Sequence, residues 1–350
     1  MKFAILLFVL TSYQLYSQNT GCLTFDNIDK IKTDTTLNQD FKNHKLVLLG
    51  EAPHIMPANT FFQSEFLIYL NKNFGTRNLL IEFGSSDAYL LNKYLQTGDS
   101  KYYDKSYYGM QHFMEAKAAY TKLYRYNLSL QQQNKIHVYG LDFEREPSLT
   151  AAVYYFLKEN DTIPEMEELT KRVKARLDTV GYDYPDPLVK FLEQELPKYS
   201  KWLSKSPDWD TINELLQFKS SYSNFYERDK FMNERFLKLP KNERYLGSFG
   251  TMHTQLDRSD VFAGLLKEKP LVINLHHENS FENDGNPIKS SFLDDIGFFR
   301  KKETKEYLKY YDQLSGCEIF IAPVNLDFNS LRSKCDYIIM LKNQHGYTKE

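Results

Sequence analysis

Short apolar runs that alternate with helix-periodic segments constrain the fold of this 350-residue chain more than any other feature. The first two runs are Lys45–Leu49 and Asn78–Phe83, and the segments that follow them, Asn59–Phe74 and Ser86–Leu95, carry apolar residues at helical spacing. Continuous apolar runs of this length are typical of parallel strands buried on both faces. The order therefore predicts an α/β fold with a mostly parallel central sheet flanked by helices.

The remaining sequence extends this pattern. A helix is predicted over Phe113–Gln133, and Ser85 or Ser86 is expected to cap the helix that ends near Leu95. Five more strands are predicted at Ile136–Leu141, Tyr245–Phe249, Leu271–Leu275, Glu318–Ala322 and Tyr337–Leu341.

From about residue 148 to residue 239 the sequence has no run of strand type. It is charged and helix-periodic, as in Glu165–Val180 and Leu188–Ser204, and prolines such as Pro197 interrupt it. We interpret this stretch as a helical insert or cap within one domain that spans residues 18–350.

The N-terminus has the three regions of a secretory signal. Lys2 is followed by the apolar run Phe3–Leu10 and then by small and polar residues up to Gln18, so we interpret residues 1–17 as a signal peptide. No later run approaches the ~20 apolar residues that a membrane span requires. We therefore expect an exported protein, periplasmic or secreted, without an integral membrane segment after cleavage. A lipid anchor on Cys22 is the less favoured alternative, because the expected leucine is missing before it.

Charge and cysteine content argue against several classes of protein. Lys and Arg total 44 against 46 Asp and Glu, and a net charge of -2 gives no long-range attraction to nucleic acid, so we expect a small-molecule partner. The three cysteines, Cys22, Cys317 and Cys335, cannot all pair within one chain, and none has the C-x-x-C spacing of a metal or redox motif. A Cys317–Cys335 disulfide and three free thiols remain alternatives.

Residues suited to acid–base or metal chemistry follow four of the predicted strands. Glu51 comes just after the first strand, Glu82 closes the second, Asp142 follows the third and His253 follows the fourth. In open α/β sheets, ligands bind outside the carboxyl ends of the strands, where loops from separate strands converge. The coincidence predicts one shared pocket, although each residue alone also fits an ordinary loop or helix-capping role.

Two further residues complete the candidate set. In Gly50-Glu51-Ala52-Pro53-His54, glycine permits a sharp exit from the strand, and His54 can take a proton from water near neutral pH. A helix-capping loop histidine is the alternative. Arg228, in the helical segment before the fourth strand, can orient a carboxylate or hold an anionic or carbonyl group of a substrate. The alternative there is a salt-bridged, exposed helix face. The pair His276-His277 is a secondary ligand candidate, because it lacks H-E-x-x-H spacing.

These motifs, in this order, resemble the erythromycin-esterase-like superfamily, whose wider relatives include haem-binding uptake proteins and Tiki and TraB type proteins. No serine lies in a G-x-S-x-G elbow, so the nucleophile of a serine esterase is missing. The resemblance covers about residues 45 to 275. It is carried by Gly50-Glu51-Ala52-Pro53-His54, Glu82, Gly140-Leu141-Asp142, Arg228-Asp229 with Asn233, and Gly250-Thr251-Met252-His253.

The resemblance implies hydrolysis of an ester, lactone or related acyl bond without a covalent serine. His54 would activate water, Glu82 or Glu51 would orient it, and His253 with Arg228 would stabilise the developing oxyanion. A metal-assisted version would use His54, Glu82 and His253 as ligands of a divalent cation, and the sequence establishes no cofactor with certainty.

One departure from the family pattern bears on the substrate. The pattern has an arginine nine residues after the first histidine, where this chain has Gln63. We therefore assign Gln63 to substrate binding, and the resemblance favours hydrolase chemistry more than macrolide esterase activity. A non-catalytic, haem-type ligand-binding protein of the same fold and a metal-dependent peptidase remain alternatives.

Overall fold

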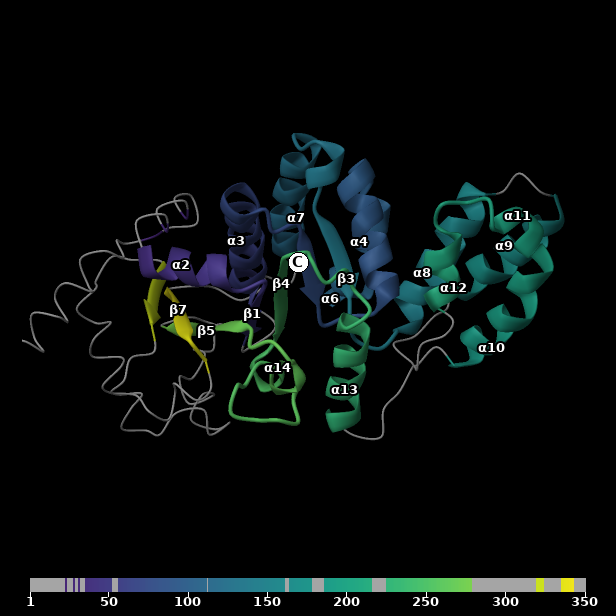
Figure 1. Ribbon diagram of the computed structural model, residues 1–350. Coiled ribbons are helices and arrows are strands. Elements are labelled where there is room, and N and C mark those ends of the chain that lie inside the picture. Colours follow the sequence, from purple (N-terminus) through teal and green to yellow (C-terminus); the bar gives the residue numbers. More distant parts are fainter. Residues whose placement is uncertain are drawn as a thin grey trace, which may run out of the picture. The chain divides into compact units, whose positions relative to one another are not determined.

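The computed structural model describes residues 23, 28, 31, 35–51, 56–111, 113–160, 164–177, 186–215, 225–278, 319–323 and 335–342 (Figure 1). Contacts divide the chain into two compact units. Unit 1 comprises Met1–Thr76 with Arg244–Glu350, and unit 2 comprises Arg77–Glu243. Each unit is described by itself below.

Unit 1 contains a sheet whose strands follow the order β4-β1-β5-β7-β6. Strands β4, β1, β5 and β7 are parallel, and β6 pairs antiparallel with β7. The side chains of β1 from Leu46 to Leu49 are buried, as a strand covered on both faces requires. The predicted α/β fold with mostly parallel strands is therefore confirmed. The bounds are β1 (Leu46–Glu51), β4 (Tyr245–Gly250), β5 (Leu271–Glu278), β6 (Ile319–Pro323) and β7 (Tyr337–Lys342).

Local sequence signals determine where α3 of unit 1 begins and ends. Helix α3 begins with Pro57, whose missing N–H costs nothing in a first turn, and it ends at Gly75, which has a left-handed φ of 71°. The rings of Phe41 and Phe66 lie 5.5 Å apart and join α2 to α3. The described helices of this unit are α2 (Thr35–Asn43), α3 (Pro57–Phe74), the 3₁₀ helix η4 (Thr251–His253) and α14 (Phe262–Leu265).

Unit 2 contains the parallel pair β2 (Asn78–Ile81) and β3 (His137–Gly140), with helices between the two strands and after β3. All seven predicted strands, counted over both units, are present within three residues of their predicted ends. Before β3 the helices are α4 (Ser85–Thr97), α5 (Ser100–Asp104), α6 (Tyr107–Gln111), α7 (Phe113–Leu128) and η2 (Gln132–Asn134). After β3 they are α8 (Glu146–Glu159), α9 (Pro164–Leu177), α10 (Asp186–Glu195), η3 (Leu196–Tyr199), α11 (Ser200–Leu203), α12 (Trp209–Leu215) and α13 (Phe225–Phe236).

The described part of the segment between β3 and β4 is helical, and Pro197 interrupts it as the sequence predicted. Helix α10 ends at Glu195, and a 3₁₀ turn carries Pro197. Proline removes a backbone donor and clashes with the preceding turn, which accounts for the break. Among the residues that the structure describes, no helix has both the length and the apolarity of a membrane span.

The N-terminus of α4 differs from its prediction. The expected caps, Ser85 and Ser86, are instead the first two helical residues, and Gly84 precedes them without a side chain to serve as a cap. The carboxylate of Glu144 takes this role, because it accepts hydrogen bonds from the N–H groups of Ser85 (2.7 Å) and Ser86 (3.1 Å) and from the Ser86 hydroxyl. An anion is favourable at this end of a helix.

Candidate functional site

In unit 2, Arg228 joins two of the predicted carboxylates. Its Nε donates to Asp142 Oδ1 (2.9 Å) and Oδ2 (3.0 Å), and its Nη2 donates to Glu82 Oε1 (2.5 Å) and to Asp142 Oδ2. Glu82 follows β2, Asp142 follows β3, and Arg228 comes from α13. Three predicted site residues that are far apart in the sequence therefore meet in one cluster.

The backbone explains why the two carboxylates lie together. Strands β2 and β3 are parallel and in register, with Ile81 opposite Gly140, so their carboxyl ends are neighbours. The Asp142 N–H then donates to the carbonyl of Phe83 (3.0 Å). Position 140 must be glycine for this approach, because a Cβ atom there would lie 2.0 Å from the carbonyl oxygen of Gly84.

The charges of this cluster are mutually dependent. Burial raises the pKa of Asp142, the hydrogen bonds and charge of Arg228 oppose that rise, and the charge of Glu82 adds to it. Burial disfavours the charged form of Arg228, yet its bonds to Asp142 raise its pKa overall. A buried carboxylate is tolerated only when it is paired and hydrogen-bonded. When all three groups are ionised, the cluster carries a net charge of about -1.

A second arginine of α13, Arg235, binds the backbone of the cluster residue Asp142. Arg235 lies two helical turns after Arg228, and its Nη1 donates to the backbone carbonyl of Asp142 (3.1 Å). The same guanidinium lies 4.0 Å from Glu144, whose pKa burial raises. Arg235 therefore fixes the Asp142 backbone. Its positive charge also partly offsets the negative charge of Glu144, the buried cap of α4.

Unit 1 brings two other predicted residues to adjacent strand ends. Glu51 pairs with Gly250 in the register of β1 and β4, and the Thr251 hydroxyl donates to the Glu51 carbonyl (3.0 Å). His253 closes the 3₁₀ turn that begins at Thr251, and its side chain is buried.

The role predicted for Gly50 is wrong. Instead of giving a sharp exit from the strand, Gly50 lies inside β1. A Cβ there would come within 2.2 Å of Asn274 Oδ1 and 2.4 Å of Thr254 Oγ1, so the glycine makes room for these side chains.

The remaining predicted residues have different outcomes. Gln63 lies in α3 and is buried. His54 falls outside the described residues, as do Cys22, Cys317 and the whole predicted signal peptide. Glu82, Asp142 and Arg228 meet in unit 2, Glu51 and His253 lie at neighbouring strand ends in unit 1, and a single site built from all of them stays a prediction.

Among the described residues, no three His, Cys, Asp or Glu side chains come together as possible ligands of a metal ion. His54, one of the three predicted ligands, lies outside these residues, so the metal-assisted version stays a prediction. The Glu82 carboxylate, one of the predicted ligands, already binds the Arg228 guanidinium at 2.5 Å. A divalent cation on Glu82 would lie close to this positive charge, which disfavours it.

Sequence reasoning missed Asp87, a fully buried carboxyl group in α4. Its Oδ1 accepts hydrogen bonds from the Tyr108 N–H (2.8 Å) and the Ser148 hydroxyl (2.7 Å), so it links α4 to α6 and α8. Burial raises the pKa of Asp87 from 3.8 to about 7. A helix-periodic stretch with an Asp in its first turn looks like an ordinary exposed start, and nothing local signals the burial.

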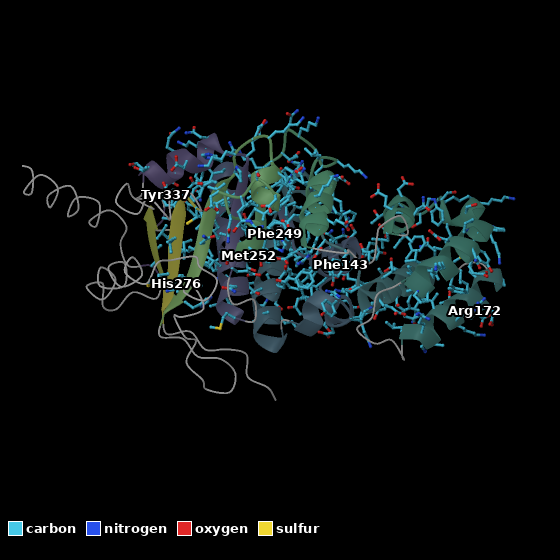
Figure 2. All side chains as sticks on the ribbon, turned by 90° about the horizontal axis from the view of Figure 1, so that it is seen from below. Phe143, Arg172, Phe249, Met252, His276 and Tyr337 are labelled. Atoms are coloured by element: carbon cyan, nitrogen blue, oxygen red, sulfur yellow. The ribbon has the colours of Figure 1, made fainter. Side chains whose placement is uncertain are left out.

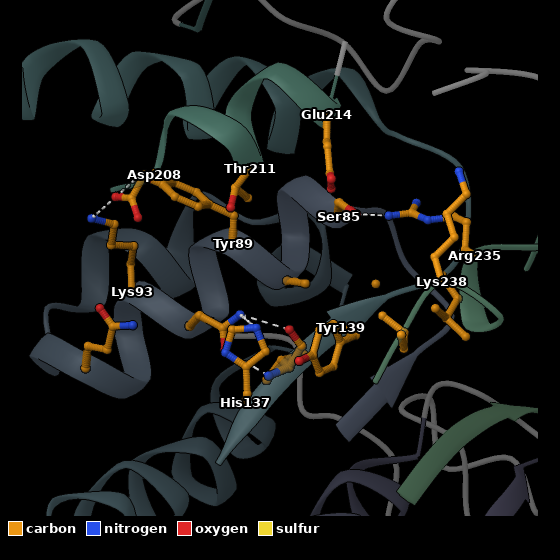
Figure 3. A pocket seen from close by; sticks show the side chains of 17 residues that line it. Ser85, Tyr89, Lys93, His137, Tyr139, Asp208, Thr211, Glu214, Arg235 and Lys238 are labelled. Carbon is orange, nitrogen blue, oxygen red and sulfur yellow. Dashed lines mark hydrogen bonds and ion pairs between the residues drawn. The ribbon is translucent and has the colours of Figure 1, made fainter. Parts of the chain in front are cut away.

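A cavity of about 420 Å³ lies within unit 2 (Figure 3). Its walls come from one face of α4, from β3, from Asp208 with α12, and from the end of α13. Lys93 and Asp208 form an ion pair of 2.7 Å at one end, and Arg235 and Lys238 line the other. Because Arg235 also holds the Asp142 backbone, the cavity wall and the carboxylate cluster share a residue.

Fold and carboxylate cluster together define an α/β protein with acid–base groups at the carboxyl ends of parallel strands. A family model described as erythromycin esterase matches residues 72–259, which is more than half of the chain. The chain therefore belongs to the erythromycin esterase family. No curated protein matches it.

Three solved structures are similar in fold. A protein from Bacillus cereus is 14% identical, with a TM-score of 0.61, and the match covers 96% of this chain and 98% of that one. A succinoglycan biosynthesis protein is 13% identical, with a TM-score of 0.58 and coverage of 95% and 96%. A mutant of the erythromycin esterase EreC, in its open conformation, is 13% identical, with a TM-score of 0.54 and coverage of 91% and 95%.

Proposed function

We propose that this chain is a hydrolase that cleaves an ester, lactone or related acyl bond of a small molecule with activated water. The observation that carries the proposal is the pairing of Glu82 and Asp142 by Arg228 at the ends of two parallel strands. Charged groups that are costly to bury are held here in a fixed arrangement, which is how active sites tune acid–base groups. Membership of the erythromycin esterase family supports esterase-type chemistry.

In the proposed reaction, His54 takes a proton from water while the water oxygen bonds to the acyl carbon. Glu82, held in place by Arg228, orients the water or the imidazole, and His253 stabilises the oxyanion of the tetrahedral intermediate. The acyl–oxygen bond then breaks, and the leaving alkoxide takes the proton from His54. Arg228 acts here as a positioning residue, because its hydrogen bonds go to carboxylates of the chain itself.

Turnover of a broad ester panel by the purified chain tests the proposal. His54→Ala and Glu82→Gln should lower kcat by about 10²–10⁴-fold, the usual contribution of general acid–base catalysis. Glu243→Gln is the matched control, because Glu243 also binds an arginine, Arg77, but lies far more exposed than Glu82. Its turnover should match that of the unmodified chain.

Two results would refute the proposal: no hydrolysis of any ester in the panel, or full turnover in both variants. A chain that hydrolyses nothing but changes the absorption spectrum of haem on titration would instead be a ligand-binding protein.

Export to the periplasm or the medium is part of the same proposal, and the basic, apolar and polar regions of residues 1–17 support it. N-terminal sequencing of the protein recovered from the periplasmic fraction or the medium should begin near Gln18. An unprocessed Met1 in protein recovered only from the cytoplasm would contradict export.

A further inference from the structure

His277 presents a buried hydrogen-bond acceptor in unit 1. It lies in β5 next to His276, which Figure 2 labels, and only 3% of the residue is exposed. Its Nε2 lies 2.7 Å from Asn59 Oδ1 in α3. An amide oxygen only accepts hydrogen bonds, so Nε2 carries the proton and Nδ1 is left as an acceptor.

The ring is uncharged near neutral pH. Burial, together with the charge of the neighbouring His276, lowers the pKa of His277 from 6.5 to about 3. Burial also lowers the pKa of His276, to about 4, so neither imidazole carries a positive charge at that pH.

Within the part of the chain that the structure describes, His277 Nδ1 has no hydrogen-bond partner, and the same holds for Gln63 Nε2. Gln63, which is also 3% exposed, follows Asn59 by one helical turn, so both residues lie on the same side of α3. That side is the one that contacts His277. Buried polar groups in folded proteins are almost always hydrogen-bonded, so an unpaired donor and an unpaired acceptor in one region call for a polar ligand group.

The opposite face of β5 is separate from this pair. Asn274 precedes His277 by three residues, so their side chains point to opposite faces of the sheet. The oxygen of Asn274 accepts a hydrogen bond from the Thr254 hydroxyl (3.5 Å), which lies after β4. The pair of Gln63 and His277 therefore belongs to the α3 side alone.

We infer that Gln63 and His277 bind a hydroxyl group of the substrate. A hydroxyl can donate to the Nδ1 acceptor and accept from the amide donor at once. A carboxylate or phosphate would direct oxygen lone pairs at the Nδ1 lone pair, and an ammonium would direct N–H groups at the amide N–H₂. The inference rests on the proposed function, which it deepens by giving a hydroxylated acyl ester as the substrate class.

Matched ester pairs test this inference. Ethyl butyrate is compared with its 2-, 3- and 4-hydroxy forms, and propyl butyrate with glyceryl butyrate, so that the hydroxyl is offered on either side of the ester. At least one hydroxylated ester should have a kcat/KM about 10–100-fold above its partner, the range for one or two hydrogen bonds to buried groups. Gln63→Leu and His277→Phe should each abolish most of that preference. Ser64→Ala, the adjacent buried residue of α3, is the control and should keep it.

A binding measurement separates this inference from the proposed function. In protein labelled with ¹⁵N in histidine, the Nδ1 signal of His277 should shift on addition of at least one of the 2-, 3- and 4-hydroxybutyramides, and should not shift with butyramide. This measurement needs no turnover. A shift without any ester hydrolysis would support the hydroxyl site while it refutes the hydrolase.

Three results would overturn the inference. The first is hydrolysis with equal kcat/KM within every ester pair. The second is a preference that Ser64→Ala loses as fully as Gln63→Leu. The third is an Nδ1 signal that already has a hydrogen-bonded shift in the free protein and responds to none of the amides, which would show a structural water only.

Discussion

Replacing Arg228 with methionine should destabilise the protein, because it leaves the buried Asp142 without the cation that offsets its burial. Removing one partner of a buried ion pair costs about 3–5 kcal/mol. The Arg228 side chain is 22% exposed and that of Asp142 5% exposed, so we expect a loss near the lower end of that range, about 3 kcal/mol. Arg77→Met is the matched control. The pair of Arg77 and Glu243 is 35% and 28% exposed, and such a pair contributes about 0–1 kcal/mol.

The loss of folding stability in Arg228→Met should depend on pH in a defined direction. Burial already raises the pKa of Asp142 above its ordinary value of 3.8, and removal of the guanidinium raises it further. A group whose pKa is raised by folding contributes stability that is present below its unfolded pKa and is lost as pH rises through its folded pKa. The deficit relative to the unmodified chain should therefore be small near pH 4 and grow towards neutral pH.

Urea unfolding followed by circular dichroism, at about pH 4 and about pH 7.5, measures both effects. Asp142→Asn in the Arg228→Met background should recover stability at the higher pH, because it removes the unpaired charge. A loss no larger than that of Arg77→Met, or a double variant no more stable than Arg228→Met, would refute the reasoning.

Three further predictions use the same unfolding assay. Glu144→Gln replaces one of the two carboxylate oxygens that accept from the Ser85 and Ser86 N–H groups with an N–H₂ donor, and it should cost about 1–3 kcal/mol. An unchanged unfolding midpoint would show that other groups cap α4. The pKa of Asp87, raised from 3.8 to about 7, should make stability fall as pH rises across that interval, and Asp87→Asn should flatten this slope; equal slopes would contradict the assignment. Gly140→Ala places a Cβ 2.0 Å from the carbonyl of Gly84 and should cost about 1–3 kcal/mol, whereas a fully stable variant would mean that this loop yields.

The strands could be predicted because their signal is local. A run such as Tyr245–Phe249 is mostly apolar and follows the charged Arg244, and the structure extends it by only one residue, to Gly250. The adjacency of Glu82 and Asp142 followed from the same signal, because carboxyl ends of parallel strands meet at one edge.

What could not be predicted depends on contacts between distant residues. The cap of α4 comes from Glu144, 59 residues after Ser85, so the local serines gave the wrong answer. The burial of Asp87 likewise follows from the packing of α6 and α8 on α4. No sequence pattern within α4 predicts either contact.

The charge balance around Arg228 changes the role that the sequence suggested for it. Sequence alone left Arg228 as a group for a substrate anion or an oxyanion, but its Nε and Nη2 donate to Asp142 and Glu82. With two ionised carboxylates against one guanidinium, these three groups carry about one negative charge, which disfavours an oxyanion beside Arg228. In the proposed reaction Arg228 therefore positions Glu82, and the oxyanion depends on His253.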